Sequence, residues 1–156
     1  MDATLTEASD EAFLEEYSRR FEIVSGDAFN NAQQVARHLQ GLLGGARRET
    51  FVALYLTQKN VLIDSEILFT GTVNQAAVYP REIVRSALLK DASNVICGHN
   101  HPSGNIKPSN DDIEITRKLN KALDLLDITL LDHVIIGGDK WFSFADHNLL
   151  QKGGQP

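Results

Sequence analysis

Short apolar runs alternate with amphipathic stretches along most of this chain, and few folds accommodate that order. The runs 51–56 and 61–69 are separated by a polar turn and predict a β-hairpin. Further runs at 94–98, 128–136 and 141–145 predict three more strands. Because helical patterns lie between several of these strands, we expect an α/β or α+β domain in which helices flank a mixed sheet.

The spacing of apolar residues predicts which face of each element packs into the core. One helix is expected to begin at Pro80 and end near Lys90, and another to begin at Ser109. The expected faces are Val61, Ile63, Ser65, Ile67 and Phe69 on the second strand, Ile83, Val84, Ala87 and Leu88 on the first of these helices, and Ile115, Leu119, Ala122, Leu123 and Leu126 on the other.

Two more helices are expected before the hairpin. Residues 9–24 carry aromatic side chains at helical spacing among charges. Asp27 is expected to cap a second helix, whose apolar face would comprise Ala28, Val35, Leu39 and Leu42. We therefore divide the chain into an N-terminal helical extension (1–46), a main domain (47–150) and a frayed polar tail (151–156).

Charge and cysteine content exclude several classes of protein. The 156 residues include 21 acidic and 15 basic ones, for a net charge of −6, which disfavours nucleic-acid binding by charge alone. The single cysteine, Cys97, excludes an internal disulfide and any multi-cysteine zinc site. No apolar run is long enough to span a membrane, and no signal peptide is evident, so we expect a cytoplasmic protein.

Two histidines stand where a buried strand ends, and an aspartate follows in the next helix. His99 and His101 are two residues apart, so their side chains project to the same side of an extended chain. Asp112 falls in the first turn of the helix that begins at Ser109, where side chains lean back toward the preceding loop. Two imidazoles and one carboxylate suit Zn²⁺ and leave a fourth position for water.

Other interpretations of these residues remain open. Ser109 and Asp112 have the spacing of a capping box, which requires no metal, and a strand-end pair of histidines can occur by chance. A non-haem iron site with two histidines and one carboxylate is a second metal candidate. A zinc deaminase is excluded because it needs more cysteines, and the helical H-E-x-x-H motif of other zinc proteases is absent.

The spacing of His99, His101, Ser109 and Asp112 resembles the zinc site of the JAB1/MPN/Mov34 (JAMM) metalloprotease superfamily. The wider sequence resembles its bacterial, RadC-like branch. The matching segments are His99-Asn100-His101-Pro102-Ser103-Gly104, Pro108-Ser109, Leu131-Asp132-His133, Phe142-Ser143-Phe144-Ala145, Phe69-Thr70-Gly71-Thr72 and Pro80-Arg81-Glu82. Longer RadC proteins carry an N-terminal helix-hairpin-helix segment, whose pattern the first 48 residues lack, so the chain looks like the short, stand-alone form.

The resemblance implies a JAB/MPN-like, cytidine-deaminase-like fold and a zinc-dependent hydrolase. It implies one Zn²⁺ per chain on His99, His101 and Asp112, with Ser109 donating a hydrogen bond to the oxyanion. Glu49, at the start of the first strand, takes the place of the general base, with Glu66 as its rival. The implied activity is a metallopeptidase that cuts amide or isopeptide bonds in a peptide or protein substrate.

Two other functions and several single residues complete the sequence-based picture. A DNA-repair-associated protein that binds or processes nucleic acid is one alternative, and a non-catalytic MPN-like scaffold is the other. Asp132 and His133 could hold a ligand imidazole or form a satisfied core pair, and Cys97 could be a fourth ligand or simply pack. His38 and His147 are expected on the surface. The oligomeric state is open.

Overall fold

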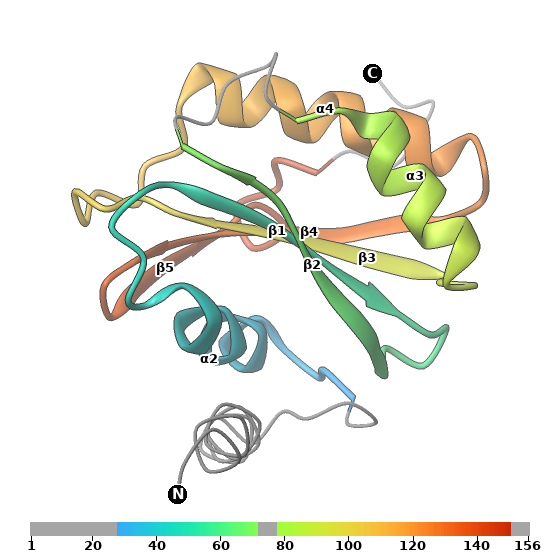
Figure 1. Ribbon diagram of the computed structural model, residues 1–156, viewed down its shortest axis with the longest axis horizontal. Coiled ribbons are helices and arrows are strands. Elements are labelled where there is room, and N and C mark those ends of the chain that lie inside the picture. The colour runs from blue at the N-terminus through green and yellow to red at the C-terminus, as the bar shows by residue number, and fades with distance from the viewer. Residues whose placement is uncertain (1–27, 72–77, 151–156) are drawn as a thin grey trace, which may run out of the picture.

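Five strands form one mixed sheet in the computed structural model, which describes residues 28–71 and 78–150. The sheet has the order β2-β1-β3-β4-β5 (Figure 1). Its strands are β1 (Thr50–Leu56), β2 (Leu62–Thr70), β3 (Asn94–Asn100), β4 (Thr129–Gly137) and β5 (Lys140–Ser143). Only β3 and β4 pair in parallel, and the other neighbours pair antiparallel. The expected hairpin and the α/β class with a mixed sheet are confirmed.

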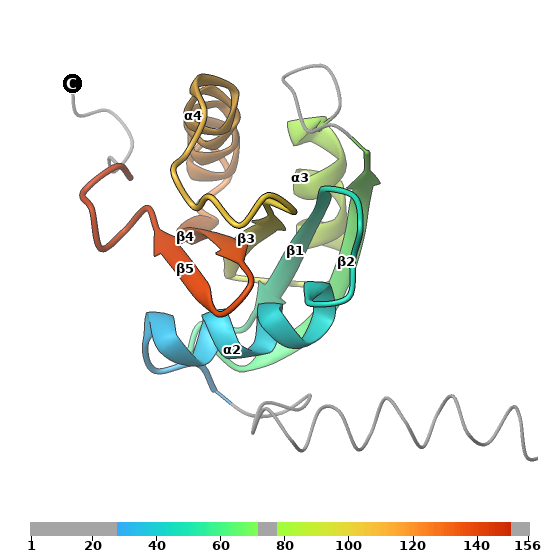
Figure 2. The ribbon, with the colours of Figure 1, turned by 90° about the vertical axis from the view of Figure 1, so that its left-hand side faces the viewer.

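Helices cover both faces of the sheet. The helix α2 (Ala32–Leu43) lies on one face, and α3 (Pro80–Leu89) and α4 (Asn110–Asp124) lie on the other (Figures 1 and 2). Side chains of β1 therefore enter two apolar clusters, with Ala53 packed on the side of α3 and α4, and Leu54 packed on the side of α2. This double burial explains why the first strand reads as a nearly continuous apolar run.

Several expected core positions are exposed. The exposed fraction is 68% for Ile67, 56% for Leu88, 46% for Leu126 and 42% for Leu42. A bulge in the hairpin pairs Val52 with Ile67 and turns that side chain outward, and Leu126 lies beyond the last residue of α4. Leu88 misses the face of α3 that buries Ile83 and Ala87.

The second helix begins later than the sequence pattern predicts. Its N-cap is Asn31, whose side chain accepts a hydrogen bond from the Gln34 amide, so Ala28 lies before the helix. The face of α2 that packs on the sheet includes Leu39 and Leu43, so it buries His38, which we expected on the surface, and leaves Leu42 exposed. Asp27, the helix expected at residues 9–24 and the tail at 151–156 lie outside the described residues.

The end of β3 lies close to α2 on one face and to the start of α4 on the other. Gly98 packs directly on α2, since a Cβ there would come within 2.6 Å of Leu39 Cδ1. The chain leaves β3 at Asn100 and reaches α4 through the loop 101–109 (Figure 2). No helix in the described ranges is long and apolar enough to cross a membrane.

Candidate metal site

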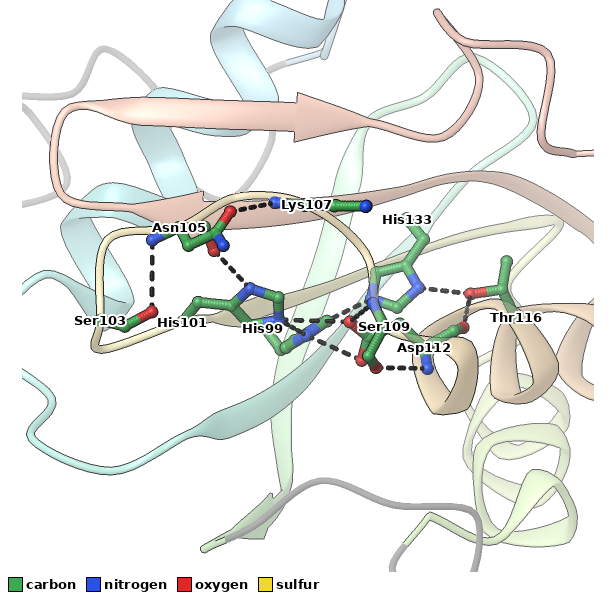
Figure 3. Close-up of polar contacts among 9 residues, drawn as sticks. All are labelled: His99, His101, Ser103, Asn105, Lys107, Ser109, Asp112, Thr116 and His133. Atoms are coloured by element: carbon green, nitrogen blue, oxygen red, sulfur yellow. Dashed lines mark hydrogen bonds and ion pairs between the residues drawn. The ribbon is translucent and has the colours of Figure 1, made fainter.

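His99, His101 and Asp112 converge at the junction of β3 and α4 (Figure 3). The Nε2 atoms of the two histidines are 2.9 Å apart. Asp112 Oδ1 lies 3.2 Å from Nε2 of His99, and Oδ2 lies 3.2 Å from Nε2 of His101. His99 and Asp112 are buried, whereas His101 is partly exposed at the mouth of the site. The residues singled out by spacing in the sequence thus form one cluster.

A capping box holds Asp112 in this position. Ser109 Oγ accepts a hydrogen bond from the Asp112 amide at 3.0 Å, and Asp112 Oδ2 accepts one from the Ser109 amide at 2.8 Å. The expected cap is therefore present, and the same carboxylate still reaches both histidines. Capping and metal binding are compatible at this residue, because the cap aims the carboxylate at the cluster.

The donor atoms fit a single divalent cation. Nδ1 of His101 is 2.6 Å from the carbonyl oxygen of Asn105, which can only accept, so Nδ1 donates and Nε2 keeps its lone pair in the neutral ring. Ligands about 2.0–2.1 Å from a tetrahedral zinc ion are separated by about 3.3 Å, close to the separations found here. A cluster of two imidazoles and one carboxylate could therefore hold a metal ion.

The protonation states of the site residues show that a bound cation would take the place of a proton on His101. Burial alone raises the pKa of Asp112, but its close contacts with the imidazoles of His101 and His99 and the hydrogen bond from the Ser109 amide outweigh burial and hold that pKa well below its usual range. The hydrogen bond to Asp112 raises the pKa of His101. The carboxylate therefore stays ionised, and a bound metal competes with a proton on His101.

Glu49 and Ser109 share a cavity with the cluster. This cavity, of about 340 Å³, is open to solvent and is lined by Glu49, His101, Pro102, Ser103, Asn105, Lys107, Ser109, Asp111 and Asp112. Glu66 lies elsewhere, because it accepts hydrogen bonds from Tyr55 at 2.7 Å and from Ser86, and lines a separate hollow beside Tyr79. The placement favours Glu49 over Glu66 as a base, and the catalytic roles of Glu49 and Ser109 stay predictions.

Asn100 supports the backbone on both sides of Glu49, a role that sequence reasoning missed. Its Oδ1 accepts from the Thr50 amide at 2.7 Å, and its Nδ2 donates to the Arg48 carbonyl at 3.1 Å. Because successive residues of a strand face opposite sides, Asn100 points away from the side of the two histidines. The sequence offered one signal for this role: Asn100 lies between two candidate ligands at the end of a buried strand, and a buried amide needs hydrogen-bond partners.

The other candidate residues separate into two groups. His133 Nε2 lies 2.7 Å from His99 Nδ1, whereas Asp132 accepts hydrogen bonds from Ser143 Oγ and the Ala145 amide and does not join the cluster. Cys97 packs in the apolar core, where burial raises the pKa of its thiol, and the cluster of metal ligands does not include it. His147 is exposed, as expected.

Comparison with known proteins assigns the family. Residues 29–149 match the family model for the RadC-like JAB domain, which covers more than half of the chain. The chain belongs to the RadC-like JAB domain family. Membership agrees with the resemblance drawn from the motifs around His99 and Asp112, and the matched range includes α2 as well as the sheet.

Relatives in the RadC-like JAB family differ in length. A UPF0758 protein of Janthinobacterium sp. (strain Marseille) is 47% identical over 129 residues, covering 83% of this chain and 58% of the relative. UPF0758 protein YeeS of Escherichia coli (strain K12) is 46% identical over 125 residues, covering 80% of this chain and 84% of the relative. UPF0758 protein YfjY of the same organism is 46% identical over 126 residues, covering 81% of this chain and 79% of the relative. The chain thus spans little more than half of the first relative and most of the other two.

Proposed function

We propose that this protein is a zinc-dependent hydrolase, and specifically a metallopeptidase that cleaves amide or isopeptide bonds in a peptide or protein substrate. The observation that carries the proposal is the meeting of two imidazole Nε2 atoms and one carboxylate beside a cavity that Glu49 and Ser109 line. Three protein ligands leave a coordination position open, which is typical of catalytic zinc. The buried, reduced Cys97 suits a cytoplasmic protein.

Each residue has a defined task in this proposal. His99, His101 and Asp112 would hold the ion, which when bound supplies Lewis-acid polarisation and acidifies a water molecule. Glu49 accepts a proton from the attacking water and returns it to the leaving amine. Ser109 accepts from the Asp112 amide through its oxygen, so its hydroxyl proton stays available to the oxyanion of the substrate.

The surface around Glu49 supports an extended substrate. A second hollow of about 450 Å³ adjoins the cavity, since Glu49 and Pro102 line both. Arg47 and Arg48 line this second hollow. A ligand that reaches from His101 to Arg48 must be elongated, and a peptide segment meets that requirement better than a small molecule does.

Metal content tests the ligand set. Protein purified without chelator is expected to contain one Zn²⁺ per chain by elemental analysis, and His101→Ala is expected to lose it. His147→Ala is the matched control, because that exposed imidazole lies outside the cluster. Absence of metal from the wild type, or equal metal in His101→Ala, would contradict the proposed site.

Hydrolysis of a quenched fluorescent peptide library tests the reaction. Glu49→Gln is expected to keep its zinc and lose turnover by a factor of about 10²–10⁴, as expected when a general base is removed. Glu66→Gln is the control, since it alters a carboxylate in the separate hollow. Full activity in Glu49→Gln would refute the role of Glu49, and a zinc-loaded wild type that cleaves neither the peptide library nor isopeptide-linked substrates would refute the metallopeptidase.

A further inference from the structure

A chain of hydrogen bonds joins two of the proposed metal ligands behind the site (Figure 3). Nδ1 of His99 lies 2.7 Å from Nε2 of His133, and Nδ1 of His133 lies 2.6 Å from Oγ1 of Thr116. Thr116 Oγ1 in turn lies 2.7 Å from the backbone carbonyl oxygen of Asp112. The chain therefore runs from one ligand on β3, through β4 and α4, to the backbone of another ligand.

The last contact determines the direction of the whole chain. A carbonyl oxygen can only accept, so the Thr116 hydroxyl donates its single proton to Asp112. Its oxygen must then accept from His133, which places the proton of that ring on Nδ1. The opposite orientation would leave two oxygen acceptors 2.7 Å apart with no proton between them.

Because His133 is neutral, the direction of donation between His133 and His99 is fixed as well. His133 is fully buried, and its ring stacks on Phe144 at 4.7 Å and meets Phe51 edge-on at 5.5 Å. The ion pairs found within 28–71 and 78–150 do not include it, and an unpaired charge at such a site would be costly. A neutral His133 with its proton on Nδ1 accepts through Nε2, so Nδ1 of His99 must be the donor.

We propose that Thr116 and His133 are positioning residues that hold His99 in the Nδ1–H tautomer, leaving its Nε2 lone pair for the metal. The inference rests on the metal site of the proposed function. The carbonyl of Asn105 imposes the same tautomer on His101 from the other side. Two Nε2 lone pairs then face each other at 2.9 Å, an arrangement that a shared cation stabilises.

Metal affinity in Thr116 variants tests this role. Thr116→Val removes the acceptor for His133 Nδ1–H, so His133 moves its proton to Nε2 and forces His99 to carry its proton on Nε2, where the metal should bind. Zn²⁺ affinity, measured by competition with a chromophoric chelator, is expected to fall about 10- to 100-fold. Thr116→Ser keeps the hydroxyl and should keep wild-type affinity. Ser86→Ala, which removes a hydroxyl that donates to Glu66 in the separate hollow, should also keep it.

Histidine tautomers in the metal-free wild type provide a second test that needs neither metal nor turnover. Long-range ¹⁵N–¹H NMR at pH 8 should show His99 and His133 protonated on Nδ1 and both switched to Nε2 in Thr116→Val. A proton on Nε2 of His99 in the wild type, or unchanged Zn²⁺ affinity in a folded Thr116→Val, would overturn the inference. If Thr116→Val does not fold, the wild-type spectrum decides. Loss of peptide hydrolysis with these results intact would refute the proposed function alone.

Discussion

Asn100 and His99 are adjacent in the sequence and serve opposite faces of the same strand. The imidazole of His99 belongs to the cluster of candidate metal ligands, whereas the side-chain amide of Asn100 forms hydrogen bonds with the backbone on either side of Glu49. The two adjacent residues thereby fix the candidate base, Glu49, and a candidate metal ligand, His99, relative to each other. The period of two along a strand makes this division of tasks possible.

Removal of the Asn100 amide is expected to destabilise the protein and misplace Glu49. Asn100→Ala leaves the Thr50 amide without its buried acceptor, which should lower the free energy of unfolding by about 1–3 kcal/mol in urea titration. Turnover should fall while zinc content stays at one per chain. Asn94→Ala removes an amide from the other end of β3 and should reduce stability without this selective loss. Equal turnover in the two variants would contradict the expectation.

At the scale of an element, the first turn of α4 combines a cap with a ligand. Ser109 supplies the oxygen that caps the helix, and the same turn carries Asp112, whose carbonyl oxygen accepts a hydrogen bond from Thr116 one turn later. A single short segment therefore contributes to the metal site through both a side chain and a carbonyl group. Its position should matter for activity as well as for helix stability.

Two substitutions separate the tasks of Ser109. Ser109→Ala should lose about 0.5–2 kcal/mol of stability because the Asp112 amide loses its cap. Ser109→Asp retains a capping oxygen and should keep most of that stability, yet at pH 7 it has no hydroxyl proton to donate. Thermal melts and peptide turnover measured together should show low activity in both variants and low stability in the first alone. Wild-type turnover in either variant would count against an oxyanion role.

The helix α2 carries a buried histidine that should make stability depend on pH. Burial lowers the pKa of His38 to about 4, and within the described residues its Nε2 has no hydrogen-bond partner. The unfolded chain, with a histidine pKa near ~6.5, therefore binds the proton first as pH falls. The contribution of His38 is fully present above pH ~6.5 and is lost between ~6.5 and about 4.

Comparison of the wild type with His38→Leu isolates this effect. The free energy of unfolding of the wild type should fall relative to the variant by up to about 3 kcal/mol between pH 7 and about 4, since other titrating groups cancel in the difference. Urea titrations at several pH values measure it. A difference between the two proteins that does not change with pH would show that His38 is accessible to protons in the folded state.

At the scale of the whole molecule, the cluster of candidate metal ligands joins parts of the chain that are distant in sequence. His99 and His101 belong to the end of β3, Asp112 belongs to α4, and His133 on β4 contacts His99. A cation bound there would link the sheet to the helical layer that covers it. Metal binding and folding stability should therefore be coupled.

Removal of the metal should lower thermal stability in proportion to affinity. A ligand present at 100 times its dissociation constant adds about 2.7 kcal/mol to the free energy of unfolding. Calorimetry with Zn²⁺ and with excess chelator should show a higher melting temperature in Zn²⁺, and His101→Ala should show no such difference. Identical wild-type melts under both conditions would contradict binding at this cluster.

Local patterns were sufficient to predict much of this protein. The hairpin, the strand that ends beside His99, and the helix capped by Ser109 follow from periodicity and capping chemistry, which act over a few residues. The convergence of the two histidines with Asp112 could also be expected, since the loop between them is short and side chains of a first turn lean toward it. The sequence alone therefore determined the elements and the ligand cluster.

Long-range packing decided the rest. The burial of His38 depends on which face of α2 packs on the sheet, and the exposure of Ile67 depends on a bulge in its pairing with β1. Two contacts hold the site in place. The hydrogen bond between Asn100 and Thr50 joins residues 50 positions apart, and the one between Thr116 and His133 joins residues 17 positions apart. Pattern rules cover single elements, whereas these contacts exist only after the sheet has brought separate elements together, so the tertiary structure alone determines them.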